Sequence, residues 1–351
     1  MNSGLEGIVA AETRLSMVDG ERGRLVIGGY RVEELANASF ERTVSLLWGI
    51  AGFEGEVRAA PLPAHTLELL RSAAVARVEV MDALRMAAGT LTADGDGAAA
   101  RLLVGSFPTI VSAYWRLLHG REPLAPRGDL GFAANYLYML TGSEAHEELV
   151  RGLETYLNTV VDHGLNASTF TARVIASTGS DFVSAITGAI GALKGPLHGG
   201  APGPALDMVF EIGDVARADE VLRRKISSGE RLMGFGHRVY KVRDPRADVL
   251  AAGAARMFTR AGDMHLYELA RGVEAVALRL LEEHKPGRNL QTNVEFYTAL
   301  LLHGLGLEVP LFTPTFAVSR VAGWTAHCFE QRQVARIIRP QSVYVGSMPA
   351  E

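Results

Sequence analysis

Residues 147–161 of the chain read EELVRGLETYLNTVV, and they show which kind of fold to expect. Their apolar positions recur every three or four residues, which is the spacing of one face of an amphipathic helix. These positions are Leu149, Val150, Leu153, Leu157, Val160 and Val161. Gly164 follows shortly afterwards, where a glycine commonly ends a helix. The same period returns at 246–259, 273–281, 296–302 and 316–334, so the sequence predicts an all-α fold class.

The first thirty residues are the exception to this helical pattern. Residues 13–18 alternate between polar and apolar side chains, and Asp19 and Gly20 are typical turn residues. A second short run at 24–27 leads into Gly28 and Gly29. The sequence therefore predicts a short N-terminal β-hairpin attached to the helices.

Length and charge limit the class of protein. The 351 residues are enough for one or two buried cores. Lysine and arginine total 35 against 39 acidic residues, for a net charge of −4. Proteins that bind nucleic acid or a membrane surface usually carry a basic face, so we expect no nucleic acid and no membrane as partner. The net charge does not exclude a pocket that is locally basic.

Cysteine content and hydropathy indicate where the protein works. The single cysteine, Cys328, excludes an intrachain disulfide, fits a reducing compartment and lies in an apolar stretch typical of a core. The N-terminus lacks the basic and apolar regions of a secretory signal. The most apolar stretch, 182–193, is shorter than the roughly 20 residues that span a bilayer. We expect a soluble, cytoplasmic protein.

Glycine and proline interrupt the helical pattern at three places that carry an ionisable residue. The first, GPLHGGAPGP at 195–204, contains His198, and the second, GFGH at 234–237, contains His237. The third, 285–293, comes just before Glu295. Loops on a rigid scaffold often carry functional groups, so these three residues are candidates for catalysis.

Each candidate also has an ordinary structural explanation. A histidine in a glycine turn, such as His198, is often only structural, although the glycines after it let a substrate approach closely. His237 begins a run with four cations, Arg238, Lys241, Arg243 and Arg246. Such a run fits either a solvated basic loop or the site of an anionic ligand.

The remaining candidates lie in the last third of the chain. Glu295 begins an apolar helix, where an acid favours the helix dipole, but in a closed apolar cleft it would be a stronger base. Arg320 lies among apolar residues, and a buried arginine normally needs an anion. Arg339 precedes Pro340 in an extended segment that could reach a neighbouring subunit.

No metal site is expected from the histidine pattern. His163, His198 and His237 lie far apart, and there is no H-x-x-x-H or C-x-x-C pair. Nor does the chain contain G-x-S-x-G, a P-loop or a dinucleotide fingerprint.

Seven segments, taken in order, resemble the citrate synthase family in its short prokaryotic form. They are VDGERGRLVIGGY near the start, DHGLNAST from Asp162, GALKGPLHGG, GFGHRVYKVRDPR, TNVEFYTALLL, LFTPTFAVSRVAGWTAH and RIIRP. They span nearly the whole chain, and several motifs in the right order are more specific than any one of them. The resemblance implies a two-domain, multihelical homodimer. Residues 1–200 and 306–351 would form the large domain, and 201–305 a small domain that closes over the substrates.

The resemblance also implies a role for each matching residue in a tricarboxylic acid cycle acyltransferase. Glu295 would remove a proton from the methyl group of acetyl-CoA, His198 would stabilise the enol or enolate, and His237 would polarise the carbonyl of oxaloacetate. Oxaloacetate would be held by His163, His237, Arg246, Arg320 and the partner's Arg339. CoA would contact Gly234, Phe235, Gly236 and Lys241. Water then hydrolyses citryl-CoA, and the reaction requires no metal or other cofactor, since acetyl-CoA is a substrate.

Departures from the family pattern leave the substrate and the activity open. The base is usually aspartate, and the extra methylene of Glu295 shifts the carboxylate by about 1 Å, which could cost about 100-fold in rate. Pro202 stands where asparagine is common, and Gly28 where an arginine often is. Citrate synthase is the main hypothesis, and 2-methylcitrate synthase acting on propionyl-CoA is the nearest alternative. A non-catalytic acyl-CoA-binding or citrate-binding relative is the third.

Overall fold

The computed structural model describes residues 4–5, 7–198 and 202–349. Its sheet has three short antiparallel strands in the order β1 (Ser16–Asp19), β2 (Arg24–Ile27) and β3 (Tyr30–Arg31). The predicted hairpin is confirmed, with Ser16 opposite Ile27. The third strand was not predicted. It forms because Gly28 and Gly29 both have positive φ, as a two-residue turn requires.

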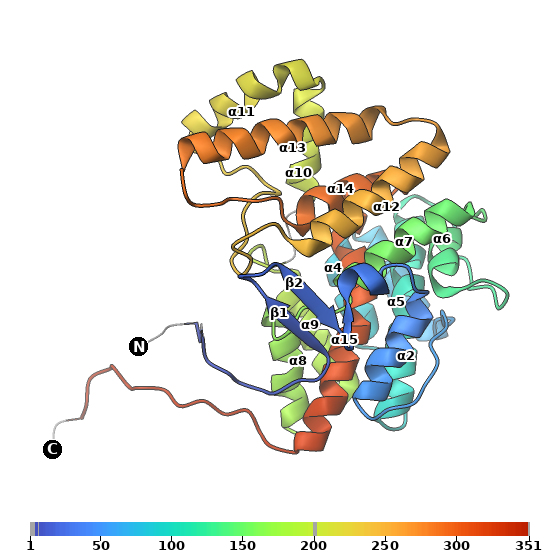
Figure 1. Ribbon diagram of the computed structural model, residues 1–351. Helices are drawn as coiled ribbons and strands as arrows, with labels where there is room; N and C mark the ends of the chain where they lie inside the picture. The colour runs from blue at the N-terminus through green and yellow to red at the C-terminus, as the bar shows by residue number, and fades with distance from the viewer. Residues whose placement is uncertain (1–3, 6, 199–201, 350–351) are drawn as a thin grey trace.

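Helices make up most of the remaining structure, which confirms the all-α class (Figure 1). The first nine are α1 (Val32–Leu35), α2 (Phe40–Ile50), α3 (Ala64–Val75), α4 (Val80–Ala88), α5 (Asp96–Leu118), α6 (Phe132–Thr141), α7 (Glu147–Val160), α8 (Ala167–Ser177) and α9 (Phe182–Leu193). They are followed by α10 (Pro202–Ile212), η1 (Val215–Arg217), α11 (Ala218–Ser227), α12 (Pro245–Ala261), α13 (His265–His284), α14 (Val294–Gly304), η2 (Val309–Leu311) and α15 (Phe312–Val334). All five helical stretches expected from periodicity lie within these helices, apart from the last residue of 147–161.

Helix α15 is the centre of the larger part of the molecule. It packs against α2, α5, α7, α8 and α9, and its side chains are buried on every face from Phe312 to Gln331. A helix buried all round belongs to the core of a large protein. Cys328 is one of these core residues, as expected. The polar residues of α15, Arg320 and His327 among them, therefore have to find their partners inside the protein.

Helices α10 to α14 form a second group at one end of the molecule (Figure 1). α11 lies along α13, while α10 and α12 pack on α14. This group meets the rest of the chain through α12 and α14 on α7, through α12 on α1, and through the turn between β1 and β2. At that turn, Lys241 N–H donates to the carbonyl of Gly20, and a Cβ on Gly20 would lie 2.2 Å from the carbonyl oxygen of Val239. The N-terminal hairpin thus touches the loop that follows His237.

Two features of the described residues concern membranes and metal ions. No single helix there is both long and apolar enough to cross a membrane; α14 and the stretch Val309–Val334 pass only as a pair, bent by 117°. Within the same residues, no group of three or more histidine, cysteine, aspartate or glutamate side chains is arranged to hold a metal ion.

Candidate active site

His237 is held as a neutral hydrogen-bond donor. Its Nδ1 accepts hydrogen bonds from the backbone N–H groups of Val239 (3.0 Å) and Tyr240 (3.1 Å). Because Nδ1 is an acceptor, the ring proton is on Nε2. Burial, aided by the charge of Arg246, lowers the pKa of His237 to about 4. At neutral pH the ring therefore offers one N–H from Nε2 and carries no charge.

Glu295 lies in the first turn of α14, two residues after the N-cap residue Asn293. A short antiparallel bridge joins this helix start to the turn before His237: Phe235 pairs with Thr292, and Asn293 N–H donates to Gly234. Burial raises the pKa of Glu295, although Arg231 and Arg246 oppose the shift. A carboxylate that is partly removed from water is a stronger base than an exposed one.

His163 joins the same cluster from the end of α7. Its Nε2 lies 3.1 Å from the hydroxyl of Tyr240, and its ring centre lies 6.0 Å from that of His237. Burial, with repulsion from Arg246 and Arg320, holds the pKa of His163 well below its usual value. Two arginine cations therefore act on one neutral histidine, which indicates that the three side chains share one site.

The two arginines differ in the groups that accept their hydrogen bonds. Arg246 is buried and donates from Nε and Nη2 to the two carboxylate oxygens of Asp244 (3.0 and 2.8 Å). Arg320 is also buried, but it donates from Nε to the carbonyl of Val160 (2.7 Å) and lies over the ring of Phe316. None of the carboxylates that the structure describes forms an ion pair with it. Burial lowers the pKa of Arg320 to about 10, so it remains a cation at neutral pH.

His198 is fixed from α8. Ser168 N–H donates to Nε2 of His198 (3.3 Å), and the Ser168 hydroxyl lies 2.8 Å from the same atom. The indole N–H of Trp324 donates to that hydroxyl (3.2 Å). Nε2 is thus the acceptor, and the proton is on Nδ1. Burial, with the charge of Arg320, lowers the pKa of His198 to about 4, so this ring is also a neutral donor.

Together these groups suit a specific kind of chemistry. Two buried cations can hold a small anion with two carboxylates, because arginine matches a carboxylate with paired N–H donors. Two neutral imidazoles can each donate to an oxygen on which negative charge develops. A desolvated carboxylate can remove a proton from carbon beside a carbonyl group.

Comparison with known proteins gives the same family that the motifs suggested. Residues 4–341 match the family model described as "Citrate synthase, C-terminal domain". The chain belongs to the citrate synthase family. It is 39% identical to a citrate synthase of Haloferax volcanii, over 99% of this chain and 96% of that protein. It is also 37% identical to a 2-methylcitrate synthase of Mycobacterium tuberculosis, over 99% and 91% of the two chains.

A solved family member has nearly the same fold. The citrate synthase of Thermoplasma acidophilum, solved as a ternary complex with carboxymethyl coenzyme A and oxaloacetate, aligns with a TM-score of 0.87. It is 30% identical to this chain, and the alignment covers 100% of this chain and 97% of that one.

The four residues predicted to contact CoA differ in what they expose. Phe235 is buried against the ring of Phe296, 5.3 Å between centres, so its side chain belongs to the core. Gly234 is required by packing, because a Cβ there would lie 2.9 Å from Cβ of Phe296. The backbone at Gly236 follows this turn, and Lys241 projects into solvent with Nζ 3.4 Å from the carbonyl of Arg238.

Arg339 is not part of the cluster in this chain. It is exposed in the C-terminal arm, which we define as residues 335–349, and Figure 1 shows this arm leaving the body beside the N-terminal arm, residues 7–14. The two arms border a cavity of about 520 Å³ whose lining includes Arg339 and Ile8.

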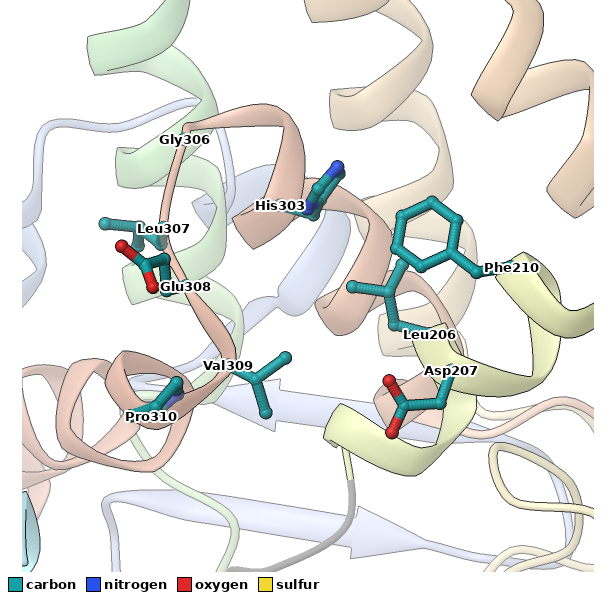
Figure 2. Close-up of a pocket in the computed structure, with 9 residues that line it drawn as sticks. All are labelled: Leu206, Asp207, Phe210, His303, Gly306, Leu307, Glu308, Val309 and Pro310. Carbon is teal, nitrogen blue, oxygen red and sulfur yellow. The ribbon is translucent and has the colours of Figure 1, made fainter.

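A separate groove of about 420 Å³ lies apart from these residues. Figure 2 shows α10, carrying Leu206, Asp207 and Phe210, on one side and residues 306–310 on the other. None of its lining residues was predicted to act in the site. The groove lies where the sequence places the boundary between the two domains, near residue 305.

Sequence reasoning missed the residues that hold the cluster in place. Asp244 fixes Arg246, Ser168 fixes His198, and Asn293 joins Glu295 to the turn before His237. The segment that begins at Asp162 contains Asn166, Ala167 and Ser168. Asn166 caps α8, and an asparagine is a common residue at a helix start, so the sequence could have indicated that Ser168 lies in the first turn of this helix. Asp244 and Asn293 likewise precede helices that were predicted.

Proposed function

We propose that the chain condenses acetyl-CoA with oxaloacetate and hydrolyses citryl-CoA to citrate and CoA. The observation that supports this most directly is the buried Arg320 guanidinium beside two neutral histidines. A cation removed from water needs an anion. Oxaloacetate supplies carboxylates for the cation and a ketone oxygen for a neutral N–H donor.

The proposed first step is enolisation. The Glu295 carboxylate removes a proton from the thioester methyl group of acetyl-CoA. Nδ1–H of His198 donates to the thioester oxygen, on which negative charge develops. A neutral histidine is a suitable donor here because it leaves the enolate as the nucleophile. The raised pKa of Glu295 makes proton removal easier.

The second step forms the carbon–carbon bond. The enolate carbon attacks the ketone carbon of oxaloacetate, and Nε2–H of His237 donates a hydrogen bond to the ketone oxygen. This oxygen takes up one proton and becomes a hydroxyl group, which balances the proton that Glu295 removed from the methyl group. His163, Arg246 and Arg320 hold the carboxylates and so fix the orientation of the ketone. Water then attacks the thioester of citryl-CoA; the carbon–sulfur bond breaks, and citrate and the CoA thiol leave.

Domain closure and dimerisation complete the proposal. Residues 201–305 would close on the large domain, formed by 1–200 and 306–351, and so remove water from the enolate. The packing of α10 to α14 as one group supports this division. Apolar side chains exposed on both arms, such as Val9 and Val345, support a homodimer in which the arms are covered and Arg339 enters the partner's site. For CoA we propose the backbone of 234–236 and the amine of Lys241. We also propose a cytoplasmic enzyme that needs no cofactor.

A thiol-release assay tests the proposal. Acetyl-CoA and oxaloacetate together should liberate free CoA, and neither substrate alone should do so. A folded protein that gives no turnover would exclude the proposed activity. Stable isotope-labelled acetyl-CoA should place its label in citrate.

Propionyl-CoA is the second candidate substrate, because the relative from Mycobacterium tuberculosis is a 2-methylcitrate synthase. One methylene changes discrimination by about 1–3 kcal/mol. The ratio of kcat/KM for the two thioesters decides between them, and we expect it to favour acetyl-CoA. A ratio in favour of propionyl-CoA would assign 2-methylcitrate synthase instead.

A further inference from the structure

A fully buried histidine, His327, lies behind the site on α15 and takes no part in the proposed chemistry. Its Nδ1 is 3.0 Å from Nη1 of Arg173, and its Nε2 is 3.2 Å from Oδ1 of Asp162. An arginine can only donate, so Nδ1 accepts and the ring proton is on Nε2. His327 therefore donates its single N–H to the Asp162 carboxylate.

Asp162 connects this histidine to the substrate cluster. It is fully buried and comes directly before His163. Its Oδ2 accepts a hydrogen bond from the Ser16 hydroxyl (2.5 Å), whose oxygen accepts one from Gly164 N–H (2.8 Å). The carboxylate is thus held between α15 and β1. Ser16 also links the two neighbours of His163, through the Asp162 side chain on one side and the Gly164 backbone on the other.

The position of the Asp162 carboxylate decides whether the Arg320 guanidinium is available to the substrate. Burial lowers the pKa of Arg320, and Asp162 is the carboxylate whose charge acts in the opposite direction. Yet Asp162 forms its hydrogen bonds with His327 and Ser16, and Arg320 donates to a backbone carbonyl instead. A buried carboxylate that lost its donor would turn toward the nearest available cation. Such a turn would occupy the guanidinium that the substrate needs.

We propose that His327 is a positioning residue for the substrate anion. By holding the Asp162 carboxylate, it keeps His163 in place and leaves Arg320 free to bind a carboxylate of oxaloacetate. The inference rests on the proposed function, since it takes oxaloacetate as the anion.

A buried network could also serve stability alone, and a matched pair of variants separates the two roles. In His327→Asn, the amide oxygen can take the place of Nδ1 and accept from Arg173, but the shorter side chain has no N–H that reaches Asp162, which keeps the hydrogen bond from Ser16. In His327→Gln, the longer amide places an N–H near the position of Nε2 and can still donate to Asp162. Arg173 then keeps its other partners, Glu330 (2.9 Å) and Gln331 (3.1 Å).

The readouts are KM for oxaloacetate at saturating acetyl-CoA, the Kd for oxaloacetate by calorimetry, and Tm. We expect His327→Asn to raise both KM and Kd by about tenfold. His327→Gln should stay within about twofold of wild type. KM for acetyl-CoA should not change in either variant. Equal values of KM for oxaloacetate in the two variants would overturn the inference.

Ser16→Ala gives an independent test if His327→Asn does not fold, because Ser16 is only half-buried. It removes the second donor to Asp162 and should also raise KM for oxaloacetate, by a few-fold. No change in KM would overturn the inference. The proposed function fails separately: a wild-type protein that neither binds nor turns over oxaloacetate excludes it, whereas an active wild type with unaffected variants excludes only the role of His327.

Discussion

The side chain of Asn293 donates a hydrogen bond of 2.8 Å to the backbone carbonyl of Gly236. The oxygen of the same amide accepts from the backbone N–H of Glu295 (2.9 Å). One residue therefore connects the turn that carries His237 to the helix start that carries the proposed base. Acid–base chemistry depends on side chains held to within about 0.5 Å. This link therefore fixes the positions of His237 and Glu295 relative to each other.

Asn293→Ala should reduce catalysis more than stability. Loss of the N-cap costs about 1 kcal/mol of unfolding free energy, and displacement of Glu295 by up to 1 Å costs about 100-fold in kcat. Steady-state kinetics and thermal unfolding measure the two effects. Asp181→Ala is the matched control, because Asp181 caps α9 in the same way but lies outside the cluster. Equal kcat values for the two variants would contradict the prediction.

Glu295→Gln should abolish most turnover while leaving substrate binding intact. A general base contributes about 10²- to 10⁴-fold, and the amide keeps the size of the side chain but cannot accept the proton. Binding of oxaloacetate and of carboxymethyl-CoA, measured by calorimetry, should stay near wild type. A wild-type protein that binds both ligands without turnover, and behaves like this variant, would instead be a non-catalytic relative.

Glu295→Asp tests the length of the base. The carboxylate moves back by about 1 Å, so kcat should fall by up to about 100-fold if the surrounding loop is built for glutamate. KM for oxaloacetate should not change, because the arginines are untouched. A variant as fast as wild type would show that α14 adjusts to either side chain.

The pH profile of kcat/KM should have an acid limb set by Glu295. Its pKa is raised above the usual 4.5, and the base acts only when ionised, so activity falls as pH drops through that raised value. His198 and His237, with pKa values of about 4, stay neutral over this range and remain donors from Nδ1 and Nε2. A limb near pH 6.5 that persists in the residual activity of Glu295→Gln would come from an ordinary histidine and would contradict the neutral state assigned to the rings.

Mixing two inactive variants tests whether Arg339 crosses the subunit interface. Subunits of Arg339→Ala and Glu295→Gln, unfolded and refolded together, should regain about a quarter of wild-type activity. Half of the dimers are then mixed, and one of their two sites has both side chains. An arginine that acts within its own chain gives no recovery, and refolding each variant alone is the control.

The amino-acid sequence by itself determined the helical fold class and the residues most suited to chemistry. Apolar side chains at a spacing of 3.6 residues, as in α7, need only their neighbours along the chain to define a helix. Glycines before His237 marked the turn there, because Gly234 and Gly236 have positive φ, which favours glycine. The motifs then identified the family before any contact was known.

Only the tertiary structure decided which nitrogen of each histidine carries the proton and which cation is free. For His198 and Arg320 those properties depend on partners distant in sequence: Ser168, 30 residues before His198, and the backbone carbonyl of Val160, 160 residues before Arg320. A hydrogen bond acts over about 3 Å, and a local pattern does not specify which distant groups come that close. The pairing of His327 with Asp162, 165 residues apart, exists for that reason only in the folded chain.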